Sequence, residues 1–96
     1  MTDGTSEAAA ALPGSELVRK GIDDLATGTE SIESLLVSIG ARRLSRLGYV
    51  LVSPIGSPEH RLYALLAAED PDSAHARYNA LIRRLVSFER AAECAS

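Results

Sequence analysis

The chain has 96 residues, of which 46% are hydrophobic, 4% are aromatic and none is Trp, and it carries a formal net charge of -3 at pH 7. This length fits one small domain, and a core built mainly of Leu, Ile, Val and Ala is typical of packed helices rather than of sheets. The negative net charge argues against a general nucleic-acid coat, because non-specific affinity for phosphates comes from many Lys and Arg side chains.

The N-terminal part of the chain is predicted to contain a tail and the first helix. Residues 1–14 have small and polar side chains, no apolar periodicity and a final Pro-Gly, so we predict a disordered N-terminal tail. We predict a single helical domain over residues 15–93 and a frayed C-terminus over residues 94–96. Ser15 is the expected N-cap of the first helix. Gly21 costs that helix about 1 kcal/mol relative to Ala, so either the helix is weak or another backbone approaches there.

Two shorter helices are expected next. Thr29 can cap a second helix that ends at Gly40, and a short third helix follows over residues 41–47 and ends at Gly48. The stretch "YVLVSPIGSP", residues 49–58, begins like a strand. No second β-rich run exists to pair with it, so we predict an extended connector.

Two Pro residues mark the starts of the last two helices, since Ser57 precedes Pro58 and Asp70 precedes Pro71. The fourth helix is expected to end near residue 68, and the fifth to continue into the low 90s. Apolar residues three and four places apart form the core stripe of the fifth helix: Ala74, Tyr78, Leu81, Ile82, Leu85, Phe88 and Ala92. The predicted fold class is therefore all-α, a compact bundle of about five helices with the long C-terminal helix as its central element.

Catalytic and metal-binding patterns are absent from the sequence. Side chains able to bind a metal occur near two helix starts, but their spacing matches no established ligand pattern: Glu59, His60, Asp70, Asp72 and His75. Cys94 lies at the frayed end, where no positioned base is expected, and neither a nucleophile elbow nor a P-loop is present. We expect a protein that is not an enzyme and that needs no cofactor or metal. A role for His60 and His75 stays open.

The last helix contains Arg77, Arg83 and Arg84, none of which has an acid three or four places away. On a helical wheel, Arg77 and Arg84 border the core stripe, whereas Arg83 and Arg90 lie on the far side. A strip of small residues runs between these pairs: Ala76, Ala80, Ser87 and Ala91. Small residues let another helix approach closely and arginines can bind its acids, so the expected partner-binding residues are Arg77, Ala80, Arg83, Arg84, Ser87 and Arg90. The alternative is that Ala is simply a good helix former at exposed positions.

The stretch "ARRLSR" offers a second surface. In a helix-turn-helix protein Arg42, Arg43 and Arg46 could contact DNA, but this helical piece of about seven residues is short for reading bases. The alternative is a solvated basic turn at a helix end. Glu89 projects toward the apolar side of the last helix, so either that helix outruns the core or Glu89 meets one of these three arginines.

These patterns lead to two hypotheses for function. The first is a small non-enzymatic helical protein-interaction module (an adaptor, accessory subunit or homodimer) that binds another protein or a second copy of itself. The alternative is a sequence-specific or phosphate-contacting DNA-binding regulator that uses Arg42, Arg43 and Arg46. A single Cys excludes an internal disulfide, no run approaches a membrane span, and the first residues lack the positive region of a signal peptide, so we expect a cytoplasmic protein without membrane contact. Nine Arg against one Lys indicate a bacterial source with a GC-rich genome.

Overall fold

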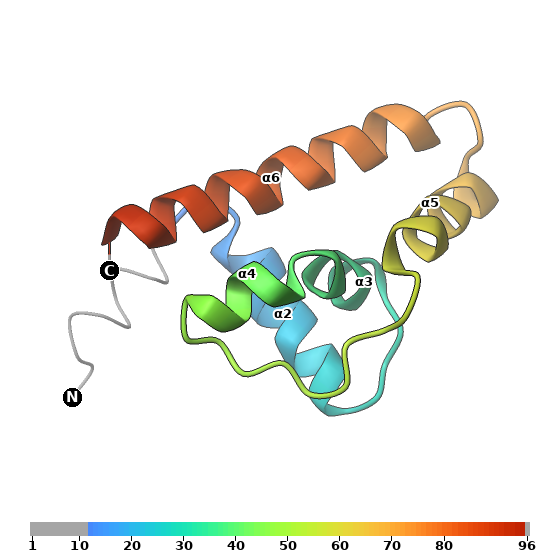
Figure 1. Ribbon diagram of the computed structural model, residues 1–96. Helices are drawn as coiled ribbons and strands as arrows, with labels where there is room; N and C mark the ends of the chain where they lie inside the picture. The colour runs from blue at the N-terminus through green and yellow to red at the C-terminus, as the bar shows by residue number, and fades with distance from the viewer. Residues whose placement is uncertain (1–11, 96) are drawn as a thin grey trace.

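The computed structural model describes residues 12–95, so most of the predicted N-terminal tail, residues 1–11, lies outside the described residues, as does Ser96. Within the described residues the chain forms five α-helices and no strand, which confirms the predicted all-α class. The helices are α2 (Ser15–Ala26), α3 (Ile32–Ile39), α4 (Ala41–Arg46), α5 (Pro58–Glu69) and α6 (Ala74–Ala95). As predicted, α6 is the longest, with 22 residues, and it runs along one side of the compact bundle (Figure 1).

Burial is most complete in α3, which lies inside the bundle. Its Leu35, Leu36 and Val37 are fully buried, α2 and α5 pack against it, and α4 and α6 also contact it. The long helix α6, predicted as the central element, contributes Leu85 and Phe88 to the same core. The domain is therefore built around two helices, because α3 lies in its interior and α6 packs along its length.

The helices α2 and α3 approach closely at Gly21, which is buried. A Cβ atom at this position would lie 2.4 Å from the carbonyl oxygen of Glu33 and 2.6 Å from Cγ1 of Val37. Only the hydrogen of glycine fits there, so close packing offsets the unfavourable helix propensity of glycine. Of the two alternatives for Gly21, the structure supports the approach of another backbone.

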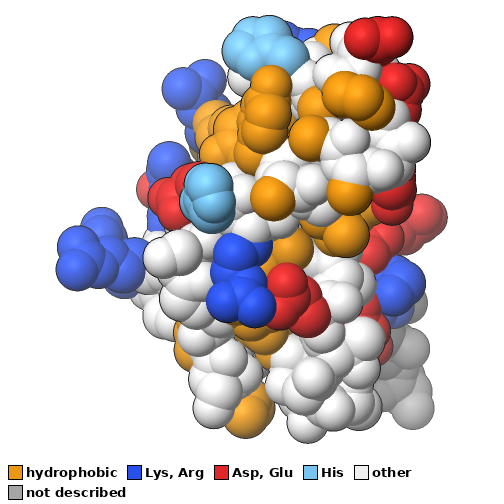
Figure 2. All heavy atoms as spheres, turned by 90° about the vertical axis from the view of Figure 1, so that its right-hand side faces the viewer, with side chains coloured by type: hydrophobic (Ala, Val, Ile, Leu, Met, Phe, Trp, Pro, Cys, Tyr) orange, Lys and Arg blue, Asp and Glu red, His pale blue; other side chains and the backbone are white. Residues whose placement is uncertain are grey.

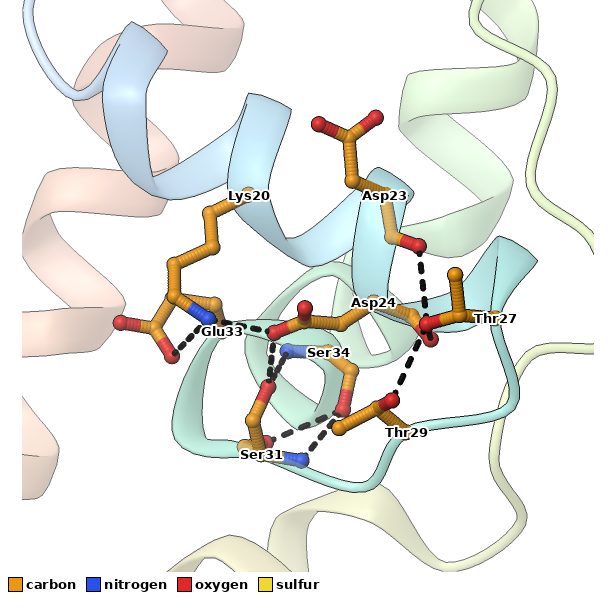
Figure 3. A network of polar contacts seen from close by, with 8 residues as sticks. All are labelled: Lys20, Asp23, Asp24, Thr27, Thr29, Ser31, Glu33 and Ser34. Carbon is orange, nitrogen blue, oxygen red and sulfur yellow. Dashed lines mark hydrogen bonds and ion pairs between the residues drawn. The ribbon is translucent and has the colours of Figure 1, made fainter.

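The N-terminus of α3 differs from the prediction, because Ser31 and not Thr29 caps the helix. Ser31 Oγ accepts a hydrogen bond from Ser34 N at 3.0 Å, and Ser34 Oγ accepts one from Ser31 N at 2.7 Å, which forms a capping box. Ser31 Oγ also donates to Asp24 Oδ2 at 2.6 Å, and Asp24 forms an ion pair with Lys20 (Figure 3). The cap is therefore held by α2, a tertiary contact that the local sequence does not contain.

The described domain is longer at both ends than the predicted one. Residues 12–14, predicted as tail, form a turn against α6, and a Cβ on Gly14 would lie 3.1 Å from the carbonyl oxygen of Arg84. Gly14, with a φ of 79°, is the N-cap of α2, and Ser15, the predicted cap, is its first helical residue. At the other end α6 continues to Ala95. Contact with α6 fixes the N-terminal turn, and such a contact has no local sequence signal.

The segment between α4 and α5 is an irregular connector without a strand, as predicted. Ser38 of α3 holds it in place: Ser38 Oγ accepts a hydrogen bond from Ile55 N at 3.0 Å and donates one to the carbonyl oxygen of Ser34 at 2.7 Å. Val50 and Val52 in this connector are 77% and 50% exposed. The connector is therefore anchored by a buried hydroxyl group rather than by a β-ladder.

The start of α5 agrees with the Ser-Pro pattern. Pro58 is the first helical residue and Ser57 precedes it, although the Ser57 side chain makes no capping hydrogen bond.

None of the helices in the described part of the chain is both long and apolar enough to cross a membrane.

The start of α6 was predicted at Pro71, but the helix begins at Ala74. The reason is that Asp70 closes a turn instead of capping a helix. Its Oδ1 accepts a hydrogen bond from Asp72 N at 3.1 Å, and its carbonyl oxygen accepts one from Ser73 N at 3.3 Å. Four residues, 70–73, therefore separate α5 from α6.

Candidate functional site

The basic side chains divide into those that meet a carboxylate and those that do not. Within residues 12–95, ion pairs are formed by Lys20, Arg43, Arg61 and Arg77. In the same part of the chain, no ion pair is formed by Arg19, Arg42, Arg46, Arg83, Arg84 and Arg90. Five of these six arginines lie on α4 and α6. Positive charge that is not neutralised inside the domain is therefore concentrated on one pair of helices.

The arginines of α6 have different surroundings. Arg77 Nη1 lies 2.9 Å from Glu69 Oε1 of α5, so its charge is matched within the domain. Arg83, Arg84 and Arg90 are exposed. Three of the four predicted arginines of this helix therefore present their charge to solvent.

The small-residue strip of α6 lies beside the N-terminal turn of the chain itself. Ala80 is half-buried and Ser87 is exposed. With Arg83 and Arg84 they line a shallow hollow whose opposite wall includes Pro13. The turn leaves less room for a second helix over this strip than the sequence alone suggests.

On α4, Arg43 is directed toward α6 and the other two arginines are not. Arg43 Nη1 lies 3.9 Å from Glu89 Oε1, and Arg43 Nη2 donates a hydrogen bond to Glu93 Oε1. Of the two alternatives for Glu89, the structure supports the meeting with an arginine of the third predicted helix. Arg42 and Arg46 are exposed. Arg43 thus links two helices, whereas Arg42 and Arg46 can contact an external group.

The carboxyl group of Glu89 is held in a confined place, with 4% of the residue exposed. Burial raises the pKa of Glu89 above its ordinary value, the positive charge of Arg43 opposes this rise, and Glu93 adds to it. Gly40 leaves the space for the carboxylate, because a Cβ at that position would lie 2.6 Å from Glu89 Oε2. Residues from the α3–α4 junction, α4 and α6 therefore define this contact together.

A groove of about 240 Å³ lies between α4 and α6, beside this ion pair. Its floor consists of apolar side chains: Ile39, Ile82, Leu85 and Val86. Arg42 and Arg46 line the groove on the α4 side. Gly40, Arg43 and Glu89 complete the lining, and we call the cavity formed by these nine residues the α4–α6 groove.

The positive charge continues along the α6 side of the α4–α6 groove. Arg83 precedes Val86 by three residues and Arg90 follows it by four, so both lie next to Val86 on the helix surface. Ile82, one turn before Val86, is half-buried, as is Val86 itself. An apolar floor between two pairs of arginines can bind a surface that combines apolar side chains with carboxylates.

All four of these arginines were predicted from the sequence as contact residues, but on two separate surfaces. Arg42 and Arg46 lie about forty residues before Arg83 and Arg90, and no local pattern indicates that α4 packs beside α6. Val86 was not identified. The sequence pattern that could have identified it is an apolar residue four places after Ile82 that does not belong to the core stripe.

A second cluster lies at the end of the molecule where α5 meets the start of α6, and there Figure 2 shows both histidines beside hydrophobic side chains. The Tyr63 ring centroid lies 5.7 Å from that of Tyr78 and 6.5 Å from that of His75, and His75 Nε2 lies 3.2 Å from Asn79 Nδ2. Burial raises the pKa of Tyr78, and the charge of Glu59 adds to the rise. No group of three or more His, Cys, Asp or Glu side chains within residues 12–95 could hold a metal ion. The cluster packs aromatic rings but has no charge pattern that specifies a ligand.

Comparison of the chain with protein-family models, with curated proteins and with solved structures gives no match. The features of the molecule that bear on its function are therefore the geometry and charge of the α4–α6 groove and of the exposed side of α6.

Proposed function

We propose that this chain is a small protein-interaction module that binds a partner protein through the exposed side of α6 and the adjacent helix α4. The observation that supports this proposal is the concentration of arginines without a carboxylate partner on these two helices, around an apolar groove. Arginine is enriched in protein interfaces, where its planar guanidinium binds carboxylates through two hydrogen bonds.

The distribution of acids in the same domain supports a role in binding another molecule. Elsewhere in the domain, Asp24 and Glu33 lie near Lys20, and Glu30, in the segment between α2 and α3, contacts Arg61. Those charges are matched internally. Five arginines of α4 and α6 form no ion pair within residues 12–95, and an acidic partner surface would supply carboxylates for them: Arg42, Arg46, Arg83, Arg84 and Arg90.

The alternative proposal, DNA binding through α4, has less support. Arg42 and Arg46 are exposed, but Arg43 is engaged by two carboxylates, so two of the three arginines are available for phosphates. Glu93 carries negative charge beside them and would repel a phosphate backbone. The α4 helix has six residues, fewer than a recognition helix needs to reach several bases.

Affinity purification with a tagged chain tests the proposed function. The charge-reversed variant Arg83→Glu with Arg90→Glu is compared with Arg19→Glu, which changes an exposed arginine of α2 that also forms no ion pair within residues 12–95. We expect a protein partner that is retained by the wild type and by Arg19→Glu and is lost from the double variant. Equal recovery with all three chains, or salt-sensitive binding of a labelled DNA duplex that both Arg42→Glu and Arg46→Glu abolish, would overturn the proposal.

The setting we propose for this module is the bacterial cytoplasm. Cys94 is a free, exposed thiol, which suits a reducing compartment, and the excess of Arg over Lys fits a bacterial genome rich in GC. A homodimer is a special case of the proposal in which the partner is a second copy of the chain.

A further inference from the structure

The spacing of side chains in the α4–α6 groove indicates the shape of what binds there. Ile82 and Val86 are four residues apart on α6, and Arg42 and Arg46 are four residues apart on α4. Residues at this spacing lie on one face of a helix, about 6 Å apart. The apolar floor and its basic edge therefore repeat with the period of an α-helix, and a partner helix with apolar residues three and four places apart would match them.

The backbone of the two walls leads to the same conclusion. Both walls are helices whose peptide groups bond within the helix, so the groove has no free strand edge that could pair with an extended peptide. A helix in the groove satisfies its own backbone hydrogen bonds, whereas an extended chain would depend on water for them.

Charge identifies the chemistry of the ligand. Arg42 and Arg46 line the groove on its α4 side. Arg83 and Arg90 lie next to Val86 on the surface of α6, three and four residues away from it, and within residues 12–95 none of these four arginines forms an ion pair. We propose that the α4–α6 groove binds an amphipathic helix of another protein, with apolar side chains on Ile82 and Val86 and with Asp or Glu on both flanks. This inference rests on the proposed function and adds the class of partner to it.

A second copy of the chain does not supply such a helix from its described residues. The acids of α2 stand on a helix whose apolar side chains Val18 and Leu25 are buried in the domain. Those of α5 stand on a helix whose Leu62 and Leu66 are fully buried. The apolar faces of these two acidic helices are therefore already used inside the fold, which favours a ligand from a different protein.

Synthetic peptides provide the direct test. The probe is a fluorescent helical peptide of about 16 residues, long enough to form a helix, with a Leu stripe at three-four spacing and Glu on both flanks. One control peptide has every Glu replaced by Gln, and another has the same composition in an order that breaks the stripe. Fluorescence anisotropy against the full chain should show saturable binding of the first peptide and binding at least about tenfold weaker for both controls.

Variants of the full chain then locate the site. Arg42→Glu with Arg46→Glu should weaken binding of the acidic peptide at least about tenfold, whereas Arg19→Glu, which reverses one charge at a distant place, should leave it unchanged. Val86→Ser should weaken binding without altering its dependence on salt, because it removes apolar contact and no charge. Far-UV circular dichroism establishes that each variant is folded, and the arginine variants decide the outcome even if Val86→Ser fails to fold.

The outcomes separate this inference from the proposed function. Equal binding of the Glu and Gln peptides, or binding insensitive to Arg42 and Arg46, would overturn the groove proposal even if a captured partner still depends on Arg83 and Arg90. Dimerisation of the chain that is lost in the Arg42 and Arg46 variant would overturn it in favour of a second copy. Loss of both peptide binding and partner capture would remove the proposed function as well.

Discussion

Arg43 of α4 and Glu89 of α6 face each other at the junction of these two helices, with 3.9 Å between Arg43 Nη1 and Glu89 Oε1. Glu89 is almost completely buried, whereas the Arg43 side chain is partly exposed. Burial favours the protonated carboxyl more strongly than the charge of Arg43 favours the carboxylate, so the pKa of Glu89 is raised. The ion pair with Arg43 therefore offsets only part of the free-energy cost of burying the carboxylate.

Replacing this carboxylate should change how stability depends on pH. Since folding raises the pKa of Glu89 above its ordinary value of 4.5, its contribution to stability is fully present below pH 4.5 and is lost as the pH rises through the raised pKa. Glu89→Gln mimics the protonated form, so the variant should unfold at a higher urea concentration than the wild type at pH 7, and the two should converge near pH 4. Urea unfolding followed by circular dichroism over this pH range measures the difference, with the exposed Glu16→Gln as control. A wild type more stable than Glu89→Gln at pH 7 would show that the attraction of Arg43 outweighs the burial.

Gly21→Ala should destabilise the domain although alanine is the better helix former. A Cβ at this position would lie 2.4 Å from a backbone oxygen of α3, so the two helices must separate. Overpacking of this kind costs about 1–3 kcal/mol, more than the gain of about 1 kcal/mol from helix propensity. Gly56→Ala is the matched control, because a Cβ at Gly56 meets nothing within 4 Å. Thermal unfolding of the two variants gives the comparison, and equal melting temperatures would contradict the close packing at Gly21.

Asp24→Asn should produce the opposite pH dependence to Glu89→Gln. The hydrogen bond from Lys20, followed by that from Ser31, lowers the pKa of Asp24 below its ordinary value of 3.8 (Figure 3). A lowered folded pKa gives stability that is present above pH 3.8 and is lost as the pH falls through the folded value. The wild type should therefore be more stable than Asp24→Asn at pH 7, and the difference should shrink as the pH is lowered below 3.8. A difference in urea midpoint that is constant between pH 7 and pH 2 would argue that the carboxylate charge is not what holds the α3 cap.

Ser38→Ala should loosen the connector between α4 and α5. The substitution removes the acceptor for Ile55 N, which then has to find water, at a cost of about 1 kcal/mol in the free energy of unfolding. Amide hydrogen exchange at Ile55 should become faster, while exchange in the middle of α6 should change only as much as global stability does. Ser87→Ala, at an exposed position of α6, is the control. Unchanged exchange at Ile55 would mean that this hydrogen bond does not anchor the connector.

Several elements of the fold could be predicted because their signals are local. Capping residues, glycines and Pro pairs together with the three-four spacing of apolar residues predicted five helices, and the Ser-Pro pair at residue 57 predicted the first residue of α5. At Gly21 the sequence left two alternatives, a weak helix or the approach of another backbone, and the close contact with α3 decides for the second. The predicted start of α6 was wrong by three residues, because an Asp-Pro pair can close a turn as readily as it begins a helix.

For the candidate site, the sequence by itself determined which residues are basic, which helices carry them and that Glu89 points toward the apolar side of the last helix. The tertiary structure decided which arginines are neutralised: Arg43 by Glu89 and Glu93, Arg77 by Glu69, and Arg42, Arg46, Arg83 and Arg90 by no group within residues 12–95. The physical reason is that helix periodicity acts over three to four residues, whereas an ion pair depends on atoms a few ångströms apart on different helices. The packing of α4 beside α6 therefore created the arginine-edged groove, although every residue in it was already present in the sequence.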